Sequence, residues 1–126
     1  MSSLLAPPVP LPKPVLEVQN KQATANEYNV AYALTAEGFE YIFRATYFGG
    51  RSIRGGVEVD FLVLAPFPTP LEIFGNFWHS GQFDANDKLR LNILQQFFNT
   101  KVRIIWGNES ETPEDARQAV RRVFRI

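Results

Sequence analysis

Three successive strand-like runs, separated by glycine and proline turns, restrict most strongly how this chain can fold. The first two runs are FEYIFRATYF and VEVDFLVL, and a glycine-rich segment at residues 49–56 separates them. The third is the short run LEIF, which follows the turn APFPTP. Aromatic and β-branched residues favour strands, whereas glycine and proline favour turns. The pattern therefore predicts successive strands, and the short turn makes the second and third of them neighbours.

Helical patterns lie on both sides of these runs. The expected helices cover about residues 25–37, about residues 85–98 and the segment from Pro113 onward, and Thr24 and Asp84 are the expected N-caps of the first two. A further strand, KVRIIW, separates the last two helices. The order α-β-β-β-α-β-α predicts an α/β fold with a mixed sheet of about four strands, flanked by helices.

The start of the chain has a different composition from the rest. Five prolines between residues 7 and 14 prevent both a helix and a central strand. We expect a Pro-rich, flexible arm over residues 1–16 and a single domain over residues 17–126. A viral structural or assembly protein that engages partners through this arm is one alternative interpretation.

The composition excludes several classes of site. With no cysteine and one histidine, the chain has no disulfide, thiolate metal site, cysteine nucleophile or multi-histidine zinc site. Its formal net charge is zero, so a nucleic acid would have to be bound by local basic patches. No apolar run approaches the roughly 20 residues that span a bilayer. We expect no membrane partner and a cytoplasmic protein, in a bacterial or phage-infected cell.

Three carboxylates stand on the predicted elements: Glu27 on the first helix, Asp60 on the second strand and Glu72 on the third. Asp60 and Glu72 can face each other if the two strands pair, and like charges so placed repel. A hard cation such as Mg²⁺ or Mn²⁺ would remove that repulsion. Arg51 and Arg54, in the glycine-rich loop, would then hold a nucleic-acid backbone over the acids.

Each of these residues also has a structural interpretation. Glu27 stands where it completes a capping box at the start of its helix. An ion pair with Arg51 or Arg103 would neutralise Asp60, and Glu72 could be a charge that protects an edge strand from aggregation. The two loop arginines could belong to an ordinary solvated hairpin.

The order of the motifs resembles the PD-(D/E)XK nuclease superfamily and, within it, the very-short-patch-repair endonuclease group. The resemblance rests on VDF at residues 59–61, GNFWH at residues 75–79 and RIIW at residues 103–106. It implies a restriction-endonuclease-like fold and metal-dependent hydrolysis of DNA phosphodiester bonds. Nicking or junction-resolving activity on branched or mismatched DNA, and a homodimer, are further expectations.

The resemblance also implies residue roles. Asp60 would be the metal-binding aspartate, Glu72 the second acid, and Glu27 the helix-borne acid that holds a metal-bound water. His79 would act as general acid or polarise the phosphate, because an imidazole transfers protons near neutral pH. Trp78 corresponds to an aromatic residue that enters between base pairs in the group.

Two departures from the superfamily pattern bear on catalysis. The proline that usually precedes the aspartate is Val59 here, and the lysine that usually stands two residues after the second acid is Phe74. Lys88, one turn into the second helix, is the expected replacement for that lysine and a candidate contact to nucleic acid. If catalysis is lost with the lysine, the chain would be an inactive nucleic-acid-binding module of the same fold.

Overall fold

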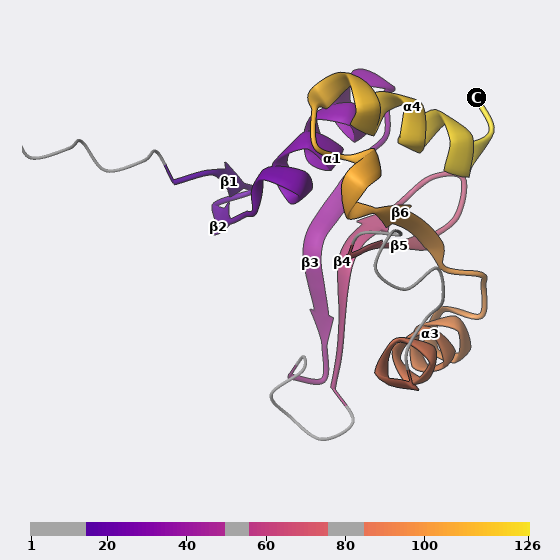
Figure 1. Cartoon of the computed structure of the whole chain (residues 1–126). Coiled ribbons are helices and arrows are strands. Elements are labelled where there is room, and N and C mark those ends of the chain that lie inside the picture. The colour runs from indigo at the N-terminus through magenta and orange to yellow at the C-terminus, as the bar shows by residue number, and fades with distance from the viewer. Residues whose placement is uncertain (1–14, 50–55, 76–84) are drawn as a thin grey trace, which may run out of the picture.

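The computed structural model describes residues 15–49, 56–75 and 85–126. Its centre is a four-stranded mixed sheet in the order β3-β4-β5-β6, with α1 and α4 over one face and α3 over the other (Figure 1). The strands are β3 Tyr41–Tyr47, β4 Val57–Val63, β5 Thr69–Phe74 and β6 Arg103–Trp106. The helices are α1 Ala25–Ala36, α3 Ala85–Phe98 and α4 Pro113–Phe124. The α/β class, the order of these helices and strands from α1 onward and the four-stranded sheet match the prediction.

The helix starts follow from local side-chain chemistry. The Thr24 hydroxyl accepts from the Glu27 N–H at 3.1 Å, and the Glu27 carboxylate accepts from the Thr24 N–H at 2.8 Å. This capping box satisfies N–H groups that have no partner within the helix. Thr112 likewise accepts from the Asp115 N–H at 3.1 Å at the start of α4. The Thr24 cap confirms the prediction, whereas Asp84, the expected cap of the second helix, lies outside the described residues.

The strand directions explain why the sheet is mixed. Strands β3, β4 and β5 pair antiparallel, whereas β6 pairs parallel to β5. The connection from β5 to β6 contains α3, which covers the sheet face opposite α1 and α4 (Figure 1). A further hairpin precedes α1, formed by β1 Glu17–Val18 and β2 Lys21–Gln22. Gln19 and Asn20 both have positive φ there, as a two-residue hairpin turn requires.

The two faces of the sheet carry separate apolar cores. One core joins α1 and α4 to the sheet through Leu34, Phe43, Phe61 and Val120, all fully buried. The other joins α3 to the sheet through Leu94, which is 1% exposed. The shared burial holds the ends of β4 and β5 in fixed positions between the helices, because close-packed interiors resist displacement.

The side chains of β4 do not keep to one face as a regular strand would. The alternation in VEVDFLV predicts that Val57, Val59, Phe61 and Val63 share one face, and this is wrong: the first two pack with Leu94 and the last two pack beneath α1 and α4. On β3 the residue between Phe43 and Ala45, Arg44, has φ of +50°. A left-handed residue breaks the regular pleat, so both strands change face at this level. Asp60 stands at the same level of β4.

Among the described residues, no helix combines the length and the apolar character that crossing a membrane requires.

Candidate active site

The candidate site lies where β4 and β5 stop pairing. Their ladder ends at the pair Phe61 and Leu71, and the following part of β5 pairs with β6. Beyond this point side chains bind the backbone amides: the Asp60 N–H donates to Glu72 Oε1 at 3.1 Å, and the Ile73 N–H donates to Asp60 Oδ2 at 2.9 Å. These two bonds hold both carboxyl groups between the diverging strands, in agreement with the prediction that Asp60 and Glu72 face each other.

All three acids that the sequence singled out line one pocket of about 340 Å³. Asp60 comes from β4, Glu72 from β5 and Glu27 from the first turn of α1. The other lining residues are Thr24, Ile73, Phe74, Asp87 and Arg90. Elements distant in sequence thus bring three carboxyl groups into one small volume. Separate structural roles for the three acids would not require this gathering.

Arg90 of α3 is the residue of this pocket that the sequence interpretation missed. Its Nε donates to Glu72 Oε2 at 3.1 Å, and one terminal nitrogen donates to Glu72 Oε1 at 2.7 Å and to the Glu58 carbonyl at 2.6 Å. This arrangement is a two-pronged ion pair, the strongest form of arginine–carboxylate contact. A signal was present: Arg90 precedes the buried Leu94 by four residues, so both lie on the helix face toward the sheet.

Among the described residues, Glu72 is the most deeply buried acidic or basic side chain, with 1% of its surface exposed. Burial raises the pKa of its carboxyl to about 8, repulsion from Asp60 acts in the same direction, and Arg90 opposes both. Desolvation penalises the ionised form of Glu72 more than the partly exposed Arg90 stabilises it. Near neutral pH the Glu72 carboxyl therefore favours its protonated form or an additional cation nearby.

β5 lies between β4 and β6, so the interpretation of Glu72 as an edge-strand charge is wrong. The capping role of Glu27 is observed, and Arg44 also donates to its two oxygens at 3.2 and 3.5 Å. Glu27 therefore lines the pocket while its oxygens serve the helix start and Arg44. Arg103, considered as an ion-pair partner of Asp60, lines a separate pocket.

The remaining predicted residues fall into two groups. Lys88 is exposed on α3 and is not part of the pocket lining, whereas Asp87 and Arg90 of the same helix are. Arg51, Arg54, Trp78 and His79 lie outside the described residues.

The donor set fits a hard divalent cation in part. Asp60 and Glu72 supply the one or two carboxylates that Mg²⁺ usually takes from a protein, and Mn²⁺ accepts the same oxygen ligands. Within residues 15–49, 56–75 and 85–126, no three histidine, cysteine, aspartate or glutamate side chains gather closely enough to hold a metal ion. The fit therefore rests on these two acids, with Glu27 near them but otherwise engaged.

No protein-family model, no curated protein and no solved structure matches this chain. Its function has to be inferred from its own residues and geometry.

Proposed function

We propose that the chain is a metal-dependent nuclease of restriction-endonuclease-like fold that hydrolyses phosphodiester bonds in DNA. The observation that carries the proposal is the placement of Asp60 and Glu72 on diverging strands, with their carboxyl groups in one pocket. The raised pKa of Glu72 supports it, because a site that penalises two carboxylates gains most from a bound cation. Branched or mismatched DNA is the proposed substrate, in a cytoplasmic setting.

In this proposal Asp60 and Glu72 hold Mg²⁺ or Mn²⁺, with Glu27 in support. The bound cation would activate a water for attack and neutralise charge on the phosphodiester. Asp60 is kept in place by the Ile73 N–H at 2.9 Å, so its carboxylate is oriented by the backbone of β5. His79 remains the proposed general acid, on the sequence pattern alone.

Arg90 offers a chemical replacement for the absent lysine. Phe74 cannot stabilise a developing negative charge, whereas a guanidinium can. Arg90 reaches the pocket from α3, and its side chain is 22% exposed, so it faces both Glu72 and the pocket volume. We assign it the role of fixing Glu72 and of contacting the phosphate, and this assignment takes precedence over Lys88.

A second candidate is a nucleic-acid-binding module that has lost catalysis. The ion pair between Arg90 and Glu72 favours it, because Arg90 already compensates the buried acid with bonds of 2.7 and 3.1 Å. A module of this kind would retain DNA in the absence of metal and would cleave it under no condition.

Cleavage of supercoiled plasmid and of a four-way DNA junction separates the two candidates. Each substrate is incubated with Mg²⁺, Mn²⁺ or EDTA and with the wild type, Asp60→Asn or Asp115→Asn. The asparagine at position 60 retains an oxygen that can accept the Ile73 N–H, so the variant should fold. Asp115 lies on α4, outside the pocket lining, and gives the same chemical change as a control.

The nuclease proposal expects cleavage with either metal and none in EDTA. The cleavage rate of Asp60→Asn should fall at least 100-fold, in the range for removal of one electrostatic catalytic group. The cleavage rate of Asp115→Asn should equal that of the wild type. Metal-independent retention of DNA without cleavage would instead support the binding module. Equal cleavage by Asp60→Asn and the wild type would exclude the assigned site.

A further inference from the structure

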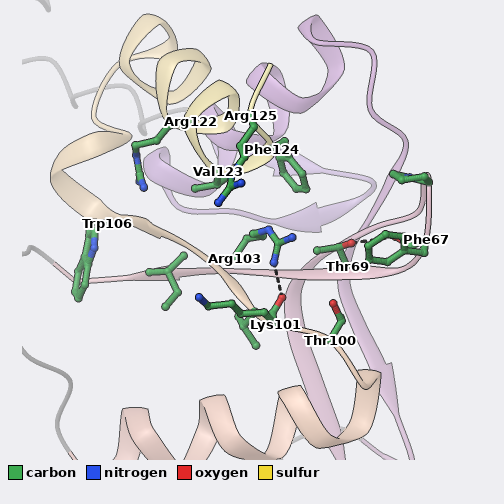
Figure 2. A pocket seen from close by; sticks show the side chains of 13 residues that line it. Phe67, Thr69, Thr100, Lys101, Arg103, Trp106, Arg122, Val123, Phe124 and Arg125 are labelled. Atoms are coloured by element: carbon green, nitrogen blue, oxygen red, sulfur yellow. Dashed lines mark hydrogen bonds between the residues drawn. The ribbon is translucent and has the colours of Figure 1, made fainter.

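A second and larger pocket lies beside the sheet edge formed by β6. Its volume is about 710 Å³, and its walls are β6 with the segment before it, the C-terminal turn of α4 and the turn between β4 and β5 (Figure 2). Four cationic residues line it: Lys101, Arg103, Arg122 and Arg125. No aspartate or glutamate is among its described lining residues. The pocket is thus a local basic surface on a chain whose formal net charge is zero.

Most of this positive charge is not compensated. Arg122 is bound to both Glu109 oxygens at 2.8 Å. In contrast, Lys101, Arg103 and Arg125 form no ion pair with any described residue. A terminal nitrogen of Arg103 donates to the Lys101 carbonyl at 2.9 Å. Cations at a helix C-terminus are common, but Lys101 lies just before β6 and Arg103 is the first residue of β6, so neither belongs to α4. Helix capping therefore does not explain this cluster.

Two aromatic rings accompany the cations, one exposed and one half-buried. Phe67, in the turn between β4 and β5, is 52% exposed, and Trp106, the last residue of β6, is half-buried. Figure 2 shows these two rings on opposite sides of the pocket, with Lys101 and Arg103 between them. Aromatic rings spaced along a basic groove are a binding surface for unstacked bases whose phosphates contact arginine and lysine.

The second pocket also adjoins the candidate active site. Trp106 lines the basic pocket, and Phe74 lines the pocket of Glu27, Asp60 and Glu72, called the acidic pocket below. Trp106 and Phe74 are paired across β6 and β5. Their ring centroids are 6.2 Å apart. A nucleic-acid strand that lies in the basic pocket and reaches Trp106 would therefore arrive beside the pocket that contains Asp60 and Glu72.

We propose that the basic pocket binds single-stranded DNA and directs it to the acidic pocket, so that the preferred substrate is DNA with a single-stranded segment next to the cleaved bond. The second half of this statement rests on the proposed nuclease function, whereas the binding itself does not. A single strand fits better than a duplex, because the bases of a duplex are not available to stack on Phe67 and Trp106. An acidic peptide would use the cations but has no bases to stack on these rings.

The test is the binding of a fluorescein-labelled oligothymidylate to the full chain in EDTA, followed by fluorescence anisotropy at 50 and 200 mM salt. Three variants are compared with the wild type: the double variant Lys101→Gln and Arg103→Gln, the single variant Arg125→Gln, and the single variant Phe67→Ala. Arg121→Gln is the matched control: it removes one cation from α4, its side chain is 51% exposed, and Arg117 still pairs with Glu37. Circular dichroism of each variant checks that it is folded.

Three phosphate contacts predict that the fourfold rise in salt weakens wild-type binding about 20-fold, since single strands lose affinity with a slope near −0.7 per contact. The Lys101 and Arg103 double variant should lose only about threefold over the same range, because one contact remains. Phe67→Ala should weaken binding about tenfold at either salt concentration, through lost stacking. Arg121→Gln should behave as the wild type.

Several outcomes would overturn the proposal: no binding by the folded wild type, equal binding by the pocket variants and the wild type, or tighter binding of a duplex, of oligouridylate or of polyglutamate than of oligothymidylate. Failure of the two proposals can be told apart. If binding depends on the pocket but no metal supports cleavage, the nuclease assignment fails and the binding surface stands. If Asp60-dependent cleavage occurs while the pocket variants bind and cleave normally, the nuclease assignment stands and the proposed binding surface fails.

Discussion

Replacing Glu72 with glutamine tests the electrostatic account of the candidate site. The buried carboxyl has its pKa raised from an ordinary value of 4.5 to about 8, chiefly by burial and then by repulsion from Asp60. An acid with a raised pKa in the folded state leaves stability intact below pH 4.5, where it is neutral in both states. As the pH rises the unfolded chain loses this proton first, so stability falls until the folded carboxyl also ionises.

The expected size follows from the same pKa values. Each pH unit between 4.5 and about 8 lowers the free energy of unfolding by about 1.4 kcal/mol, so the whole interval corresponds to on the order of 5 kcal/mol. Glu72 is 1% exposed, so solvent screens this effect little. Glutamine cannot ionise and keeps an oxygen that can accept from the Asp60 N–H. The Glu72→Gln variant should therefore gain stability relative to the wild type as the pH rises.

Urea unfolding of both proteins at several pH values from 4.5 to 8.5 measures this difference. Subtracting the two curves removes the titration of acids that both proteins share, such as Glu37, whose pKa is lowered by Arg121 and Arg117. A difference that grows with pH confirms the penalised carboxyl. A flat difference, or one that favours the wild type as the pH rises, would mean that Arg90 fully stabilises the ionised form, and the reasoning would be refuted.

Three further changes have defined expected effects, all measured by urea unfolding. Arg90→Ala leaves Glu72 buried without its cation and should lower the free energy of unfolding by about 3 kcal/mol at pH 8. The loss should be smaller at pH 5, where the carboxyl can take a proton, and an equal loss at both pH values would contradict this. Thr24→Ala removes one half of the capping box and should cost about 1 kcal/mol, whereas no measurable loss would show that the cap contributes nothing. Leu94→Ala opens a cavity between α3 and the sheet and should cost about 2–5 kcal/mol, and a loss below 1 kcal/mol would mean that this face of the sheet is loosely packed.

The parts of the fold set by local patterns could be predicted from the sequence. Helix α3 begins and ends at the residues expected from its periodicity, and Thr24 and Thr112 cap α1 and α4 as their side-chain chemistry requires. The pairing of β4 with β5 followed from the short turn between them. That pairing was sufficient to predict that Asp60 and Glu72 lie together.

Features set by tertiary context could not be predicted in the same way. The change of face along β4 depends on a left-handed Arg44 on the neighbouring strand, a conformation that no local pattern indicates for arginine. The spacing of Arg90 to Leu94 indicates which face of α3 it lies on, but its bonds to Glu72 arise only when the helix covers the sheet. The basic pocket likewise joins residues from three separate segments, so its lysine and arginines come together only when the chain folds.

Binding of Mn²⁺ to the wild type and to Asp60→Asn, detected by the loss of the electron paramagnetic resonance signal of free Mn²⁺, tests the central claim most directly. The account predicts one bound Mn²⁺ per chain, displaced by Mg²⁺, and a strong loss of affinity in Asp60→Asn but not in Asp115→Asn. Absence of Mn²⁺ binding by the folded wild type, or unchanged binding by Asp60→Asn, would contradict a metal site at Asp60 and Glu72.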